Sequence, residues 1–309
     1  MRLRLSLSQF AKLVGAKTNE LPTETIEILK KENFRYRLIL GKELARLIKS
    51  IDEEIDSGQF SAVGRGAKSK WLKGWQENLE AYVEKGFEHE ALMPKYFRPD
   101  QPVRIFGHYA TSQDPNFEWN FRQAFTYWLF NKYLKEPDNI YEFGCGSGAN
   151  LIILSKLFPW KKLYGLDWVW PSVDIVKIMR NKLKINVDGV LFDMFNPDKS
   201  FKLKSKGAVL LFSVLEQMGD QFKPFINYLI NAKPELVVHV DSIEELYDPK
   251  KMLDDLALKF MKKRKYLSNY LNYLYRLEAT KKVKIFKIQR VNFGSLYLDA
   301  YSFDIWKPL

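Results

Sequence analysis

The chain is short of the residues that build metal centres and covalent cross-links. Its 309 residues include one cysteine, Cys145, and three histidines. A single cysteine excludes an internal disulfide, and so few thiol and imidazole groups disfavour a zinc site. We therefore expect no metal. The lone thiol fits the reducing environment of the cytoplasm.

Long apolar runs are also missing. No stretch approaches the roughly eighteen apolar residues that a membrane-spanning helix needs. The opening residues Met-Arg-Leu-Arg-Leu-Ser lack the continuous apolar segment of a signal peptide. Hydrophobic residues still make up 46% of the chain and aromatic residues 15%, which is enough for two packed domains. We expect a cytoplasmic globular protein.

Acidic residues are outnumbered by basic ones, and the formal net charge is +12. Proteins of this charge often bind nucleic acid or anionic surfaces. Here the lysines are spread along predicted helix faces, with denser runs at 259–265 and 281–284. We interpret most of them as solvated surface. Nucleic acid is thus an alternative partner, not the favoured one.

What the chain does have is a glycine-rich stretch at 140–150, Ile-Tyr-Glu-Phe-Gly-Cys-Gly-Ser-Gly-Ala-Asn. It predicts a strand, a tight turn and the start of a helix. Gly144, Gly146 and Gly148 carry no Cβ, so backbone N–H groups can approach a ligand closely. The next apolar run ends on Asp167, where a carboxylate can accept hydrogen bonds from ribose hydroxyls. The pattern predicts a site for a nucleoside-containing cofactor.

Two interpretations of these glycines compete. A dinucleotide fingerprint runs through Gly144, Gly146 and Ala149. The pattern E-x-G-x-G-x-G instead begins at Glu142. A carboxylate suits the ammonium group of a methionine moiety and is poorly placed beside a pyrophosphate, which needs only donors from a helix N-terminus. S-adenosylmethionine is therefore the favoured cofactor.

The second pattern resembles the first motif of the class I S-adenosylmethionine-dependent methyltransferases, over about residues 137–309. The resemblance implies an α/β fold with a seven-stranded, mostly parallel Rossmann-like sheet that ends in an antiparallel hairpin. The sequence agrees, with further strands expected at 187–193, 207–213 and 235–240 and a hairpin at 283–291 and 300–306 with its turn at 292–294. Helices are expected at 171–184, 219–231 and 249–280.

The resemblance also assigns cofactor contacts. It implies that Asp193 contacts the adenine amino group and that Met194 lines the ring, while the aromatic Trp168 can lie against adenine. Cys145 fits the turn as a small packing residue. The residues expected to contact the cofactor are Glu142, Gly144, Cys145, Gly146, Gly148, Asp167, Trp168, Asp193, Met194 and Ser213.

Residues 1–136 form a second region, which we expect to be a mainly helical domain or lid. A serine-capped helix is predicted within 5–14, a helical stripe within 36–55, and a helix at 70–84 after a glycine-containing loop. In the methyltransferase family the segment before the glycine motif often helps to form the acceptor site. The candidate acceptor contacts there are His108, Tyr109, Asn116, Glu118 and Arg122. A linker whose aromatics join the two domains is the alternative.

Ligands of open α/β sheets lie beyond the carboxyl ends of the strands. This places Glu216 and Gln217 after the fourth strand, and His239, Asp241 and Glu244 around the end of the fifth. Glu216, Asp241 and His239 are candidate general bases, although His239 lies within its strand. Gln217 and Glu244 are candidate acceptor contacts.

These features predict methyl transfer to a hydroxyl of a sugar, glycan or related small metabolite. RNA or protein methylation is the alternative within the class, but Ser213-Val-Leu-Glu stands where an N-P-P-Y-like amine motif would be. An NAD-dependent oxidoreductase and a catalytically inactive binding module are alternatives of other classes.

Overall fold

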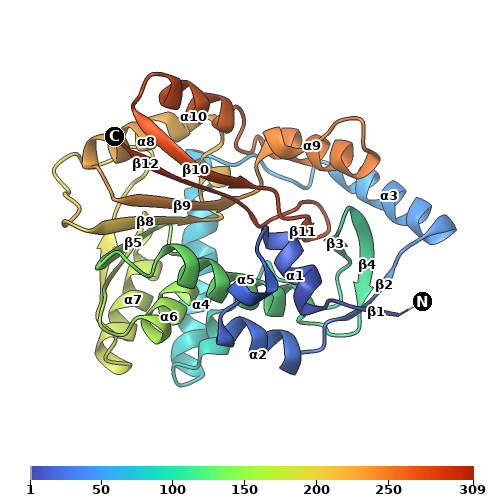
Figure 1. Ribbon diagram of the computed structural model, residues 1–309, viewed down its shortest axis with the longest axis horizontal. Helices are drawn as coiled ribbons and strands as arrows, with labels where there is room; N and C mark the ends of the chain where they lie inside the picture. Colours follow the sequence, from blue (N-terminus) through green and yellow to red (C-terminus); the bar gives the residue numbers. More distant parts are fainter. Residues whose placement is uncertain (1) are drawn as a thin grey trace.

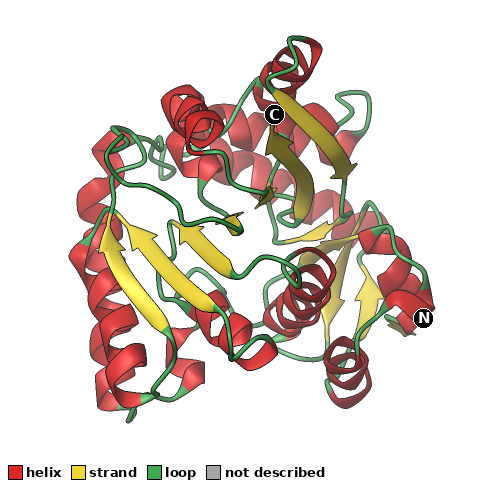
Figure 2. Ribbon diagram, turned by 60° about the vertical axis from the view of Figure 1, so that its left-hand side comes forward, coloured by secondary structure: helices red, strands yellow, loops and turns green. Residues whose placement is uncertain are grey.

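A seven-stranded mixed sheet forms the centre of the computed structural model, which describes residues 2–309 (Figures 1 and 2). Its strand order is β10-β12-β9-β8-β5-β6-β7. Five neighbouring strands are parallel: β5 (Asn139–Phe143), β6 (Lys162–Asp167), β7 (Val187–Leu191), β8 (Gly207–Phe212) and β9 (Leu236–Asp241). Two strands, β10 (Val283–Gln289) and β12 (Ser302–Pro308), complete the sheet antiparallel. The predicted seven-stranded, mostly parallel sheet is confirmed.

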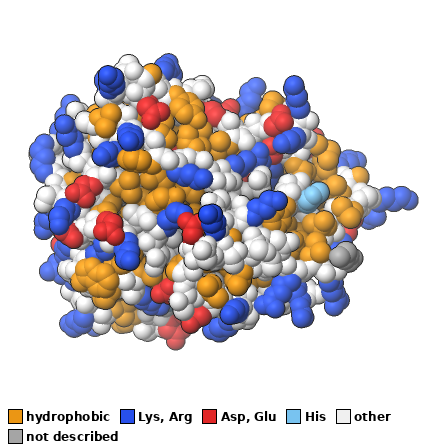
Figure 3. Space-filling view, in the orientation of Figure 1, with side chains coloured by type: hydrophobic (Ala, Val, Ile, Leu, Met, Phe, Trp, Pro, Cys, Tyr) orange, Lys and Arg blue, Asp and Glu red, His pale blue; other side chains and the backbone are white. Residues whose placement is uncertain are grey.

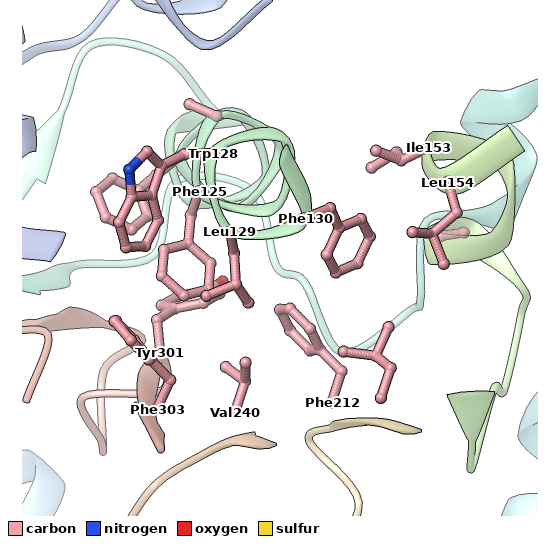
Figure 4. Close-up of a cluster of buried hydrophobic side chains, with 14 of the residues drawn as sticks. Phe125, Trp128, Leu129, Phe130, Ile153, Leu154, Phe212, Val240, Tyr301 and Phe303 are labelled. Atoms are coloured by element: carbon pink, nitrogen blue, oxygen red, sulfur yellow. The ribbon is translucent and has the colours of Figure 1, made fainter. Parts of the chain in front are cut away.

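Helices cover both faces of this sheet, because its central strands are apolar on both sides. All six residues of β8, Gly-Ala-Val-Leu-Leu-Phe, are buried. One face packs against α5 (Phe117–Tyr133), α6 (Ala149–Leu157) and α7 (Trp170–Lys182). Figure 4 shows Phe125, Leu129 and Phe130 of α5 directed toward Phe212 and Val240 of the sheet. The opposite face packs against α8 (Lys223–Ala232) and α10 (Tyr270–Ala279).

The expected C-terminal hairpin differs from the structure in its connection. The predicted turn at 292–294 is wrong, because Phe293 and Gly294 form strand β11 (Phe293–Gly294), which pairs with β3 (Val103–Ile105) in another sheet. The predicted single helix at 249–280 is also wrong. It is divided into α9 (Met252–Arg264) and α10, and Lys265 and Asn269 between them adopt left-handed φ values of 54° and 57°.

The N-terminal region contains strands that the expectation of a mainly helical domain missed. A five-stranded sheet has the order β1-β2-β4-β3-β11, with β1 (Leu3–Arg4), β2 (Arg35–Leu38) and β4 (His108–Ser112). Strands of two to five residues are too short to show a clear alternation of apolar side chains. Apart from the consecutive strands β3 and β4, their partners are also distant in the chain, so local sequence gives little sign of them.

The helices of this region are closer to expectation. They are α1 (Leu7–Val14), α2 (Thr23–Lys31), α3 (Gly41–Asp56) and α4 (Lys68–Glu84). The serine cap of α1 is confirmed: Ser6 Oγ accepts a hydrogen bond from the N–H of Gln9. Short 3₁₀ helices connect other elements: η1 (Thr18–Glu20), η2 (Arg65–Ala67), η3 (His89–Leu92), η4 (Leu215–Phe222) and η5 (Glu244–Leu246).

One hydrophobic core runs through both regions. Phe10 of α1 packs against Phe121 of α5, whose ring stacks on Phe293 of β11 with 3.6 Å between centroids. The division of the chain at residue 136 stays a prediction. Among residues 2–309, no helix combines the length and apolar character needed to cross a bilayer.

Candidate functional site

The glycine turn between β5 and α6 has a left-handed backbone conformation that residues other than glycine adopt only with strain. Gly144, Gly146 and Gly148 have φ values of 71°, 53° and 72°. A Cβ on Gly146 would lie 2.6 Å from the ring of Trp75, and one on Gly148 would lie 2.7 Å from Met179 Cε. Substitution at any of the three is therefore expected to distort the turn.

Asp167, at the end of the neighbouring strand β6, is hydrogen-bonded to this turn. Its Oδ2 accepts the N–H of Gly146 at 3.0 Å and its Oδ1 accepts the N–H of Val169 at 3.2 Å. Burial raises the pKa of Asp167 to about 6, although these backbone donors favour the carboxylate. The carboxyl group thus lies beside the turn, in the position expected for a ribose contact.

A chain of three buried side chains lies on the other side of the turn. Arg122 Nη2 donates to Asn150 Oδ1 at 2.6 Å, and Asn150 Nδ2 donates to Glu142 Oε1 at 2.6 Å. Glu142 Oε2 and Arg122 Nη1 are buried without a hydrogen-bond partner among residues 2–309. Burial raises the pKa of Glu142 to about 8, against the effects of Asn150 and Arg122.

A cavity opens beside the turn. Gly144, Asp167, Trp168, Met194 and Ser213 line it, as the sequence predicted for cofactor contacts. Phe192, Phe195, Val214, Gln217 and Met218 complete its wall on the sheet side. The cavity therefore lies at the carboxyl ends of β5, β6, β7 and β8.

Two tryptophans that the sequence interpretation did not assign to the site also line this cavity. Trp71 and Trp75 come from α4 in the N-terminal region, and their rings stack with 5.7 Å between centroids. Their spacing of one helical turn was visible in the sequence. Their position over the glycine turn is a tertiary contact that the spacing does not reveal.

The remaining predicted cofactor residues lie close by. Asp193 follows β7, and its Oδ1 accepts the N–H of Phe195 at 2.9 Å while its Oδ2 pairs with Arg65 Nη2 at 3.1 Å. Cys145 is buried inside the turn, and burial raises the pKa of its thiol well above the ordinary value. That environment favours a packing role.

His239 and Asp241 belong to a hydrogen-bonded network inside the core, in which Asp241 Oδ1 has no partner among residues 2–309. His239 is fully buried, its Nδ1 is 2.6 Å from Asp304 Oδ2, and its Nε2 is 2.8 Å from Asp241 Oδ2. Tyr270 donates its hydroxyl hydrogen to Asp304 Oδ1 at 2.9 Å. Burial lowers the pKa of His239, but Asp304 and Asp241 together outweigh it and raise the pKa to about 10. With both ring nitrogens engaged, His239 does not face an acceptor.

Glu216 is the more accessible of the candidate bases. It is half-buried at the start of η4, and its Oε1 accepts a hydrogen bond from Gln217 Nε2 at 3.1 Å. Burial, and then the nearby Asp241, raise the pKa of Glu216 to about 8. Glu244 in η5 is also half-buried, and burial followed by the charge of Glu245 raises its pKa.

The predicted acceptor segment is divided between two places. Arg122 joins the glycine turn, and Glu118 lies one helical turn before it, where burial raises its pKa to about 7. Asn116 directly precedes α5. His108 and Tyr109 instead line a second cavity beside the small sheet, and the Tyr109 hydroxyl donates to the carbonyl oxygen of Leu296 at 2.9 Å.

No family model and no curated protein matches the chain. Solved structures with a similar arrangement include a plantazolicin methyltransferase in complex with S-adenosylhomocysteine (SAH), with 15% identity over 60% of this chain and 80% of that chain and a TM-score of 0.40. An O-methyltransferase from neocarzinostatin biosynthesis shows 14% identity over 56% of this chain and 49% of that chain, with a TM-score of 0.42. A SAM-dependent methyltransferase from Aquifex aeolicus shows 18% identity over 59% and 87%, with a TM-score of 0.40.

Proposed function

We propose that this protein transfers the methyl group of S-adenosylmethionine to a hydroxyl of a sugar or related small molecule. The choice of cofactor depends on one observation. Glu142 Oε2 and Arg122 Nη1 are buried without a hydrogen-bond partner among residues 2–309, and Asn150 links the two side chains. The amino-acid end of S-adenosylmethionine has an ammonium and a carboxylate, which complement these two groups. A pyrophosphate would instead bring negative charge next to Glu142.

The cavity beside the glycine turn fits the other end of the same molecule. Asp167 lies where it can accept the ribose hydroxyls, and Trp168, Met194 and Phe195 offer an apolar surface to adenine. Asp193 directly precedes Met194, and we assign its carboxylate to accept a hydrogen bond from the adenine amino group. The bound cofactor supplies an electrophilic methyl group, and the chain's residues position the acceptor and exclude water.

Glu216 is the group that we assign as general base. A hydroxyl acceptor must lose its proton, and a base works best when its pKa is near the working pH. Glu216 has a raised pKa of about 8 and follows β8 beside Gln217, which lines the cavity. Asp241, which also contacts His239, holds this loop in place, because its Oδ2 accepts hydrogen bonds from the N–H groups of Leu215 and Glu216.

A small acceptor is favoured over nucleic acid by the distribution of charge. Figure 3 shows lysine and arginine side chains scattered over the visible face, with acidic side chains between them. A nucleic-acid site generally gathers its basic residues into a patch or stripe. Half-buried polar groups such as Glu118, Glu216 and Gln217 are better suited to hydrogen bonds with sugar hydroxyls.

Calorimetric titration of the protein with S-adenosylmethionine, SAH and NAD tests the cofactor. Binding of the two adenosyl ligands at micromolar concentrations, without binding of NAD, is the expected result. Binding of NAD alone would overturn the proposal in favour of hydride transfer. Binding of none of the three would favour a binding module without methyltransferase activity.

The base is tested with an acceptor found by measuring SAH production from a panel of sugars, glycans, metabolites and RNA. The rate should rise with pH through about 8 as Glu216 loses its proton. Glu216→Gln should lower kcat by about 10²-fold or more. Glu235→Gln, at an exposed position before β9, is the matched control. An unchanged kcat in Glu216→Gln would remove Glu216 from this role.

A further inference from the structure

The segment 63–75 of the N-terminal region is attached to several loops around the cofactor cavity. The N–H of Val63 donates to the carbonyl oxygen of Arg264, and the N–H of Gly64 donates to that of Gln217, both at 2.9 Å. Arg65 pairs with Asp193 at 3.1 Å. This segment therefore contacts the loop after β7, the loop after β8 and the end of α9.

The same segment forms the wall of the cavity that lies opposite the sheet. Trp71 and Trp75 line the cavity, and Trp75 lies directly on Gly146 of the glycine turn. Arg65 lies over the ring of Phe195 at 5.7 Å, and Lys68 lies over the ring of Trp168 at 5.6 Å. A ligand in the cavity is thus covered by residues from outside the α/β sheet.

The ion pair between Arg65 and Asp193 attaches this segment only weakly to the loop after β7. The side chains of Arg65 and Asp193 are 58% and 36% exposed, and exposed ion pairs contribute little to stability. The other end of the segment is held more firmly, because it lies within α4, whose later residues Asn78 and Tyr82 are buried.

We propose that residues 63–75 form a cover that limits exchange of the adenosyl cofactor, with the Arg65–Asp193 pair as its fastening. This inference rests on the proposed function, because Asp193 is the residue assigned to the adenine amino group. Trp71 and Trp75 are then further cofactor-contacting residues.

Stopped-flow tryptophan fluorescence measures this directly, by following displacement of SAH from the protein by excess S-adenosylmethionine. Arg65→Ala should speed SAH dissociation by about threefold to fivefold, the size expected for an exposed ion pair. Trp75→Ala removes part of the covering wall and should speed it by about tenfold or more. The control is Arg37→Ala, which removes the exposed Arg37–Glu43 pair elsewhere in the N-terminal region and should leave the rate unchanged.

Limited digestion with trypsin gives a second readout that needs no acceptor. SAH should slow cleavage after Lys68 and Lys70 in the wild type and should protect these two sites less in Arg65→Ala. Wild-type dissociation rates and protection in both Arg65→Ala and Trp75→Ala would overturn the cover. A wild-type protein that binds neither SAH nor S-adenosylmethionine would instead overturn the proposed function, so the two failures are distinguishable.

Discussion

Two buried polar networks lie in neighbouring parts of the same sheet, and they differ in how many of their polar atoms are paired. In the network of Glu142, Asn150 and Arg122, one carboxylate oxygen and one guanidinium nitrogen have no partner among residues 2–309. In the network of His239, Asp304 and Asp241, both imidazole nitrogens and three of the four carboxylate oxygens are engaged, and Asp241 Oδ1 has no partner among the same residues. Both networks are shielded from solvent.

The difference shows that burial alone does not separate a binding group from a structural one. A buried polar atom without a partner is costly, so proteins rarely keep one unless a ligand completes its hydrogen bonds. The imidazole of His239 and the carboxylates of Asp304 and Asp241 instead satisfy one another, so this network holds the fold together and leaves only Asp241 Oδ1 with capacity for a further hydrogen bond. We therefore assign the first network to the cofactor and the second to the stability of the sheet.

The largest expected effect separates the two networks by stability. His239→Gln removes the positive charge between Asp304 and Asp241, and breaking such a buried pair costs about 3–5 kcal/mol. Urea denaturation should show this loss in the free energy of unfolding. Calorimetry on the folded variant should show wild-type affinity for S-adenosylmethionine. An unchanged stability would mean that the two networks do not differ as proposed.

The second prediction reverses the pattern. Glu142→Gln keeps the shape and the contact with Asn150 but removes the charge that complements the cofactor ammonium. The affinity for S-adenosylmethionine should fall by about tenfold to a hundredfold, which corresponds to about 1.5–3 kcal/mol for a hydrogen bond to a charged group. The thermal midpoint of the free protein should change little, because Glu142 is mostly protonated at pH 7 and glutamine keeps its contact with Asn150. Glu235→Gln serves as the control, and a loss of stability equal to that of His239→Gln would contradict the comparison.

Alkaline titration gives a smaller effect that sharpens the assignment of His239. Its folded-state pKa of about 10 lies above the ordinary histidine pKa of 6.5. The stabilisation is therefore fully present below pH 6.5 and is lost as the pH rises through about 10. Chemical denaturation between pH 7 and 10 should show a declining free energy of unfolding. The decline should be shallower in His239→Gln, and an equal slope in both proteins would assign the effect to other groups.

The smallest expected effect is a proton released on cofactor binding. Glu142 has a pKa of about 8 and is mostly protonated at pH 7. An ammonium beside it favours the carboxylate, so binding of S-adenosylmethionine should release up to about one proton. Calorimetry in buffers of different ionisation enthalpy measures this number. Glu142→Gln should abolish the release, and an unaltered release would place the titrating group elsewhere.

Much of the sheet and of the cofactor pocket was predictable because its signals are local. Three glycines with positive φ, a strand before them and Asp167 after the next strand all act within a short segment. The same is true of the apolar strand β8 and of the serine cap on α1. The five-stranded sheet was not predictable in this way, because β11 pairs with β3 across almost two hundred residues.

The sequence by itself determined the glycine turn, the carboxylates around it and the parallel strands that carry them, because backbone sterics and apolar runs act over a few residues. The tertiary structure decided which buried polar groups have hydrogen-bond partners. It placed His239 between two aspartates, joined Arg122 to Glu142 through Asn150, and brought Trp71 and Trp75 over the cavity. These outcomes depend on contacts between distant segments, and only the packed fold determines which atoms meet there.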